Sequence, residues 1–396
     1  MNAQLAHEAA LRVARVAAKH AYSVDRDARF PAEAIDALRK EHLLPALVPA
    51  SFGGAGLTLT DVASFCEVIA QGCASTAMIY AMHLTQAACV ISHCCGRPWQ
   101  LAFVERMARE QLLLGSATSE ATTSGSLRAS MCAVQHDGQR FRIEKDAPTI
   151  SYGAYADAIL ITARRADDAP PSDQVLIVAL RTQIALEPQG NWDALGMRGT
   201  CSSGFRLVAN VDDAQILIPP FSDIANRTMQ PVSHALWAAV WTGIAADALR
   251  RANAYCRAQS RGLPDGMLLA RGRLVRATEQ LQMMKARLST ALAAAQTVHA
   301  AEYGKCATEL PLTVQLRFMA DMNSLKTSIS SAALKVAHEA MMICGISGYR
   351  NGGRYSIGRH LRDLYSAPLM INNDRIDQNT ASLLLAQRPS LLIEEA

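Results

Sequence analysis

The sequence has no cluster of basic residues, although it contains 39 lysines and arginines against 35 aspartates and glutamates. Its formal net charge at pH 7 is only +4. Proteins that bind nucleic acid or anionic membranes usually concentrate positive charge in a patch or a stripe. We therefore expect neither nucleic acid nor a membrane among the partners of this chain.

The ten cysteines lack the spacing of a metal site or a redox motif, because the chain has no CxxC pair and no zinc-type pattern of cysteine and histidine. In a chain of this size they are typical of buried free thiols in a reducing compartment. The chain also lacks a cationic and apolar leader, and no apolar run approaches the ~20 residues that span a bilayer. The sequence thus predicts a soluble cytoplasmic protein without a metal centre.

The chain has 396 residues, half of them apolar, which is more than one hydrophobic core usually covers, so two or three domains are expected. Residues 1–114 have helical spacing of apolar side chains. Residues 115–228 change to short alternating runs, which predict an antiparallel barrel or sandwich. Residues 229–396 return to helical spacing.

Two local features support the helical regions. Thr60 and Asp61 stand where they can cap a long helix. Leu274, Leu281 and Leu288 stand seven residues apart, which predicts a seam in a helical bundle or at a subunit interface.

The stretch Gly115–Ser151 is central to the functional prediction. It begins with a loop rich in hydroxyl and small residues (116–126), and Asp137-Gly138 then joins two alternating runs in a predicted hairpin. A loop of small and hydroxyl residues lets backbone N–H groups approach an anionic or carbonyl-rich ligand. On these residues alone, an ordinary surface turn is the competing interpretation.

Five motifs follow one another along the chain. They are FGGAGL (52–57), ATSEATTSGS (117–126), APTIS (147–151), WDALGMRGTCSS (192–203) and MMICGISGYRNGGRYSIGRHLRD (341–363). Their order, spacing and content resemble the acyl-CoA dehydrogenase superfamily of flavoproteins over nearly the whole length.

The resemblance implies an α+β fold in which the N-terminal domain is α-helical, the middle domain is an antiparallel β-barrel and the C-terminal domain is a four-helix bundle. It also implies FAD between the middle and C-terminal domains, and a homodimer or homotetramer with FAD near a subunit interface. The domain boundaries expected from the change of period are 1–114, 115–228 and 229–396.

The resemblance also assigns cofactor-binding residues. Ser151 takes the position of a hydroxyl that bonds flavin N5, and Thr149 that of a tryptophan which normally covers the ring. The alternative for this pair is two edge-strand hydroxyls without a ligand. The full set implied is Ser116, Thr118, Ser119, Gly125, Thr149, Ser151, Gly345 and Ile346. The family's arginine that reaches a partner subunit's FAD has only Arg257 or Arg261 as a substitute.

The family's catalytic glutamate has no counterpart. Its usual position, counted from Arg362-Asp363, falls on Ile371, and its other known position falls near Ser233-His234. A carboxylate is needed there because the α-proton of a thioester must be removed as hydride leaves. Asp374 is the nearest substitute, although a helix cap or an ion pair with Arg375 would explain it equally well.

Two further residues are candidates for the catalytic set. Asn373 can orient a carbonyl but cannot accept the proton. His83 lies on an apolar helix and either points into the active site or is a hydrogen-bonded core residue. The tryptophans at 237 and 241, beside His234, are interpreted as bundle core.

The favoured function is that of an FAD-dependent oxidoreductase that dehydrogenates an acyl thioester on CoA or on an acyl-carrier protein and passes electrons to an electron-transfer flavoprotein. The alternative is a flavin-dependent monooxygenase or oxidase of the same fold, supplied with reduced flavin by a separate flavin reductase and reacting with O2. A non-enzymatic flavin-binding scaffold is the third interpretation.

Overall fold

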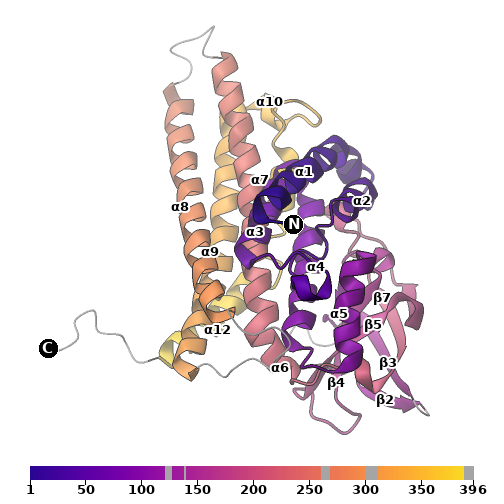
Figure 1. The fold of residues 1–396 in the computed structure, drawn as a ribbon. Helices are drawn as coiled ribbons and strands as arrows, with labels where there is room; N and C mark the ends of the chain where they lie inside the picture. The colour runs from indigo at the N-terminus through magenta and orange to yellow at the C-terminus, as the bar shows by residue number, and fades with distance from the viewer. Residues whose placement is uncertain (121–126, 138–139, 260–267, 300–310, 388–396) are drawn as a thin grey trace, which may run out of the picture.

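The computed structural model describes residues 1–120, 127–137, 140–259, 268–299 and 311–387. Helices of the N-terminal region pack between two small sheets on one side and three long helices on the other (Figure 1). This arrangement confirms the expected α+β fold, with helical N- and C-terminal regions around a middle region of strands.

The N-terminal region contains α1 (Ala3–Arg26), α2 (Ala32–Lys40), α3 (Leu59–Gly72), α4 (Ala74–His93) and α5 (Pro98–Glu110). The predicted cap of α3 was two residues late. Thr58 is the N-cap, because its hydroxyl accepts from Asp61 N at 3.2 Å while the Asp61 carboxylate accepts from Thr58 N at 2.9 Å. Asp61 therefore closes a capping box instead of starting the helix.

Helix α4 corrects the expectation that no apolar run is long enough to span a bilayer. Within the described residues it is the one helix with sufficient length and hydropathy, and 94% of its most apolar window is buried inside the protein. Such burial is that of a core helix, and α4 packs against α3, α7 and β1 (Leu114–Ala117).

The cysteines also depart in part from the expectation of buried free thiols. Among the cysteines that the structure describes, eight are free, of which Cys132, Cys201 and Cys256 are only partly buried. Cys95 is disulfide-bonded.

The middle region divides its strands between two sheets. The first has the order β1-β4-β5, with β4 (Ala158–Arg164) and β5 (Gln174–Leu180) antiparallel and β1 parallel to β4. The second has the order β2-β3-β7-β6, with β2 (Val134–Asp137), β3 (Arg140–Ala147), β7 (Phe205–Val211) and β6 (Ile184–Pro188) all antiparallel. The predicted hairpin is confirmed by the pairing of β2 with β3, while residues 138–139 of its turn lie outside the described residues.

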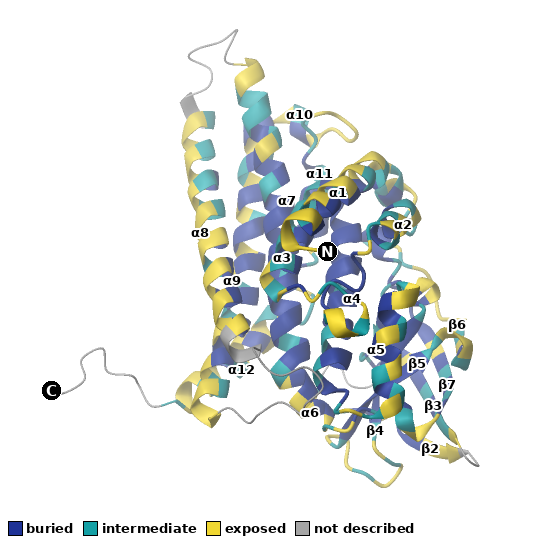
Figure 2. Ribbon diagram, in the orientation of Figure 1, coloured by how far each residue is buried: buried dark blue, intermediate teal, exposed yellow. Residues whose placement is uncertain are grey.

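The C-terminal region is built on α7 (Gln230–Gln259), α8 (Leu268–His299) and α9 (Leu312–Cys344), with α12 (Asn373–Leu385) against α9. The predicted seam of α8 faces this bundle, since Leu288 is buried and Leu274 and Leu281 are half-buried against the core. Figure 2 shows that α7 and α9 are largely buried and that the outer face of α8 is largely exposed, and α7 packs against α3 and α4.

The fourth and fifth motifs meet in space and fix the middle region against α11 (Gly358–Leu364). Met197 N donates to Asp363 Oδ1 at 2.6 Å, and burial raises the pKa of this carboxyl to about 6. Arg198 donates to Asp25 O at 2.8 Å at the end of α1. Arg198 is therefore a structural residue that ties the loop to the N-terminal helices.

Candidate active site

Two of the predicted cofactor-binding segments lie side by side. Ser119, just after β1, donates its hydroxyl to Thr149 O at 2.9 Å, and its Oγ lies 3.3 Å from Thr149 Oγ1. Ser116 and Thr118 precede it and are half-buried. We call the segments 116–119 and 149–151 the hydroxyl cradle. Gly125, which was also predicted to bind the cofactor from the loop 116–126, lies outside the described residues.

A second set of hydroxyls stands behind Ser151. Ser202 Oγ donates to Ser151 Oγ at 2.8 Å and lies 2.8 Å from Thr200 Oγ1. Because a hydroxyl has one proton, Ser202 uses its proton for Ser151, and Ser151 keeps its own proton for another acceptor. Ser202 was not predicted, although it belongs to the motif 192–203.

A buried ion pair lies directly beside the cradle. Glu120 follows Ser119, and its Oε1 is 2.9 Å from Nζ of Lys145, which is fully buried on β3. Glu120 also accepts from Met131 N at 2.7 Å and from the Ser130 hydroxyl. These contacts fix the end of the cradle to the second sheet. No periodic pattern in the sequence marks these two residues, which are 25 positions apart, as a pair.

His83 has the contacts of a core histidine, one of the two alternatives left open by the sequence. Its Nδ1 accepts from Leu114 N at 3.0 Å, and its Nε2 lies 2.8 Å from Leu44 O. Burial lowers the pKa of the imidazole to about 4, so it is neutral at pH 7 with its proton on Nε2. Both ring nitrogens therefore join β1 to the segment after α2.

The start of α12 contains the other two candidate catalytic residues. Asn372 caps this helix, accepting from Asp374 N at 2.8 Å, and Asp374 itself is exposed in the first turn. Asn373 is half-buried, with Oδ1 accepting from Lys326 Nζ at 2.8 Å and Nδ2 donating to Ser330 Oγ at 3.0 Å. The N-cap of α12 is therefore Asn372 and not Asp374.

The turn of Gly345 and Ile346, which the resemblance includes in the cofactor-binding set, is on the surface. Gly345 caps α9 with φ of 54°, and Ile346 is 67% exposed. Figure 1 places the following helix, α10 (Ile346–Tyr349), at one end of α9 and α12 near the other. Within one chain, the turn and the catalytic candidates on α12 therefore lie far apart along the bundle.

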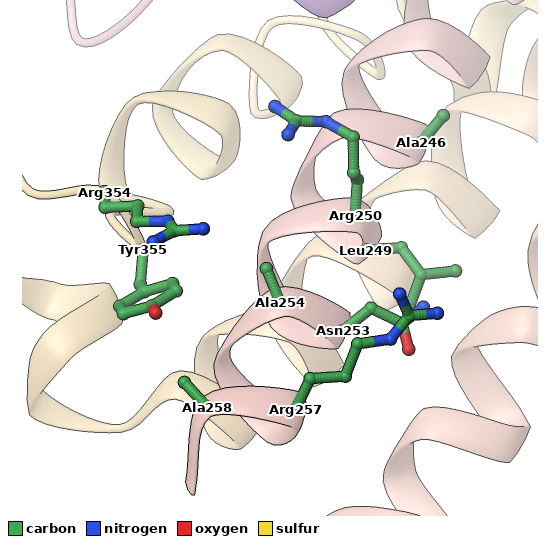
Figure 3. Close-up of a pocket in the computed structure, with 9 residues that line it drawn as sticks. All are labelled: Ala246, Leu249, Arg250, Asn253, Ala254, Arg257, Ala258, Arg354 and Tyr355. Carbon is green, nitrogen blue, oxygen red and sulfur yellow. The ribbon is translucent and has the colours of Figure 1, made fainter.

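An arginine-lined pocket of about 620 Å³ lies between α7 and the segment before α11. Figure 3 shows Arg250, Asn253 and Arg257 on one face of α7, with Arg354 and Tyr355 across from them. The arginines around this hollow suit a phosphate-bearing ligand, although Arg250 also forms an ion pair with the buried Asp247. Arg257 is one of the two arginines proposed from the sequence, whereas Arg261 lies outside the described residues.

Comparison with known proteins agrees with this fold. Residues 2–111 match the acyl-CoA dehydrogenase N-terminal domain. The chain is 24% identical over 364 residues to cyclohex-1-ene-1-carbonyl-CoA dehydrogenase of Geobacter metallireducens, covering 88% of each protein. It is 32% identical over 183 residues to L-evernosamine nitrososynthase of Micromonospora sp., covering 44% of this chain and 42% of the relative.

A solved structure extends the comparison to the whole chain. FMN-bound TdsC, a dibenzothiophene monooxygenase of Paenibacillus sp. A11-2, superposes with a TM-score of 0.83 at 20% identity, covering 97% of this chain and 98% of TdsC. The chain is therefore similar to the acyl-CoA dehydrogenase superfamily in its N-terminal domain and in its fold. Its relatives include both dehydrogenases and monooxygenases.

Proposed function

We propose that the chain is a flavin-dependent oxidoreductase that binds the isoalloxazine ring at the hydroxyl cradle. The observation that carries the proposal is the contact between Ser119 and Thr149, which unites two segments 30 residues apart into one hydroxyl-lined surface. The ring edge presents acceptors and an N–H donor, which suit hydroxyls and backbone amides. Ser151 accepts from Ser202, so its own hydroxyl proton would be available to a ring nitrogen. A bound flavin would supply the two-electron redox chemistry.

The site residues favour the monooxygenase or oxidase reaction over dehydrogenation. A dehydrogenase needs a base within hydrogen-bond reach of the substrate α-carbon. The position expected for that base is occupied by Ile371, which has no acidic group. Asp374, three residues later, is exposed in the first turn of α12. In this candidate reaction the reduced flavin comes from a separate reductase, and O2 is the second substrate, as the name of TdsC also indicates for that relative.

Dehydrogenation of an acyl thioester on CoA or an acyl-carrier protein is the second candidate. It is favoured by the similarity over 88% of its length to a CoA-thioester dehydrogenase. Asp374 would then have to turn inward from the start of α12 to act as the base, and an electron-transfer flavoprotein would take the electrons.

One experiment separates the two candidates. Flavin-loaded protein is mixed without oxygen with a panel of acyl-CoA thioesters, and the flavin absorption band is followed. We expect no bleaching, whereas protein reduced chemically or by a reductase should consume O2 and transfer an oxygen atom to a substrate, detected with ¹⁸O2. Bleaching that is lost in Asp374→Asn would overturn the monooxygenase proposal. A protein that binds no flavin would overturn both.

We further propose that the flavin is FAD and that its diphosphate reaches the arginine-lined pocket. Arg354→Ala should weaken FAD binding by about ten- to a hundredfold, because a hydrogen bond to a charged group contributes about 1.5–3 kcal/mol. FMN, which lacks the second phosphate, should bind equally to both proteins. Fluorescence titration with each flavin measures this.

The matched control for this prediction is Arg350→Ala. Arg350 is exposed on the same segment but does not line the pocket. Its substitution should leave both affinities unchanged. An equal loss of FMN and FAD affinity in Arg354→Ala would show that the pocket does not select the dinucleotide.

A homodimer or homotetramer remains part of the proposal. Met342, Ile346 and Tyr349 are 49%, 67% and 74% exposed around the α9–α10 turn. Apolar side chains grouped on a surface are typical of a subunit interface.

A further inference from the structure

Lys326 is a buried lysine in the middle of the C-terminal bundle. Its side chain is fully buried on α9, and Nζ donates to Ile371 O at 2.7 Å and to Asn373 Oδ1 at 2.8 Å. No carboxylate of the described residues lies within ion-pair distance of it. Buried lysines are rare unless paired with a charge, so this one requires a specific explanation.

The segment that Lys326 holds is strained. Ile371 has φ of 49°, in the left-handed region that a β-branched side chain rarely occupies. Such strain persists only where neighbouring contacts enforce it, and it gathers at functional sites. The hydrogen bond from Lys326 to Ile371 O is one such contact. Ile371 also occupies the position that the sequence assigns to the family's missing base.

Asn373 is fixed at both ends of its amide. Lys326 donates to Oδ1, and Nδ2 donates to Ser330 Oγ at 3.0 Å. Lys326 and Ser330 stand four residues apart on α9, so one helix face holds the start of α12. The two hydrogen bonds from Lys326 therefore determine both the backbone at Ile371 and the orientation of Asn373.

The surroundings disfavour a full positive charge on Lys326. Burial lowers its pKa to about 7, and Asp377 of α12, which is exposed, raises it only in part. A neutral amine has two N–H groups, which are the number used by Ile371 O and Asn373 Oδ1. On α7, His234 is buried, and burial together with the charge of Lys326 lowers the pKa of its imidazole to about 3. The centroid of the Trp241 ring lies 5.8 Å from Nζ of Lys326.

We propose that Lys326 is a positioning residue of the candidate active site, which holds the segment 371–373 in its strained conformation and so sets how that segment faces the substrate. The activity part of this inference rests on the proposed function, and the structural part does not. Because the same two hydrogen bonds can be made by the neutral and the charged amine, protonation changes the charge beside the site without releasing the segment.

The experiment compares Lys326→Met with Lys335→Met, a lysine on the same helix that is exposed. Hydrogen–deuterium exchange of the peptide covering 366–377 should be faster in Lys326→Met by at least about tenfold, and unchanged in Lys335→Met. Lys326→Gln keeps one donor and should give an intermediate rate, which retains the test if the methionine variant does not fold.

The second readout is turnover of the flavin-loaded protein against pH. In Lys326→Met, kcat should fall about tenfold or more with KM little changed, because a small displacement of positioning groups is costly. We also expect the wild-type pH profile to change near pH 7, where Lys326 titrates, and this change should be absent from Lys326→Met. An unchanged exchange rate in Lys326→Met would contradict the proposal that Lys326 holds the segment 371–373. Faster exchange with an unchanged pH profile would contradict a role of Lys326 in the reaction. A wild-type protein without flavin chemistry would refute the proposed function while leaving the exchange result valid.

Discussion

Replacing Lys145 with methionine is expected to lower the free energy of unfolding by about 3–5 kcal/mol, because the Glu120 carboxylate would remain buried without its counter-charge. Lys145 Nζ lies 2.9 Å from Glu120 Oε1 and also donates to Thr162 O at 2.7 Å. Burial raises the pKa of Glu120, but the charge of Lys145 and the hydrogen bond from Ser130 outweigh it and lower the pKa. The carboxylate is therefore ionised at neutral pH and depends on its partner.

The same substitution should weaken flavin binding. Glu120 directly follows Ser119, whose hydroxyl joins the two segments of the cradle. Without the charge of Lys145, the carboxylate would depend on its remaining hydrogen bonds, and a shift of Glu120 would displace this end of the cradle. Urea unfolding followed by circular dichroism gives the stability, and fluorescence titration gives the flavin affinity.

The control is Lys285→Met, which removes another lysine–glutamate pair. Lys285 Nζ lies 2.8 Å from Glu67 Oε1, but the lysine is 51% exposed. Exposed pairs contribute about 0–1 kcal/mol, so this variant should unfold almost as the wild type does. The double variant of Lys145→Met with Glu120→Gln should recover part of the loss. Equal stability of the two lysine variants would contradict the account of the buried pair.

The sequence predicted those parts of the fold that local periodicity determines. The strands β4 and β5 and the seven-residue seam of α8 each depend on neighbours within one element, and the structure confirms them. The expected alternation is wrong for β4 and β5, because both strands are buried on both faces. Thr58 was missed as the cap of α3 because Thr60 and Asp61 also have cap-forming side chains, and only the geometry selects one.

The site was predicted less completely, for a physical reason. Ser119 and Thr149 were identified through family motifs, and the structure joins them. Lys326, by contrast, lies on α9, 45 residues from the carbonyl that it binds, within an ordinary helical pattern. Such a residue acquires its role from tertiary packing, which neither spacing nor composition records.

Gly196→Ala is expected to destabilise the fold by about 3 kcal/mol or more, which is at or above the upper end of ordinary overpacking. A Cβ atom at this position would lie 2.0 Å from Arg362 O and 2.6 Å from Asp363 N. Both are backbone atoms of α11, so no side chain can turn aside to make room. The loop would have to lift from α11, breaking the hydrogen bond from Met197 N to Asp363.

Gly353→Ala is the matched control, because a Cβ atom there would meet nothing within 4 Å. It adds the same methyl group to a glycine of the segment before α11, and its free energy of unfolding should stay within about 0.5 kcal/mol of that of the wild type. Lifting of the loop in Gly196→Ala should also displace Ser202 from Ser151, since Ser202 belongs to the same motif as Gly196. Flavin affinity should therefore fall in Gly196→Ala and not in Gly353→Ala. Coincident urea unfolding curves for the two variants would show that the loop does not depend on this close approach.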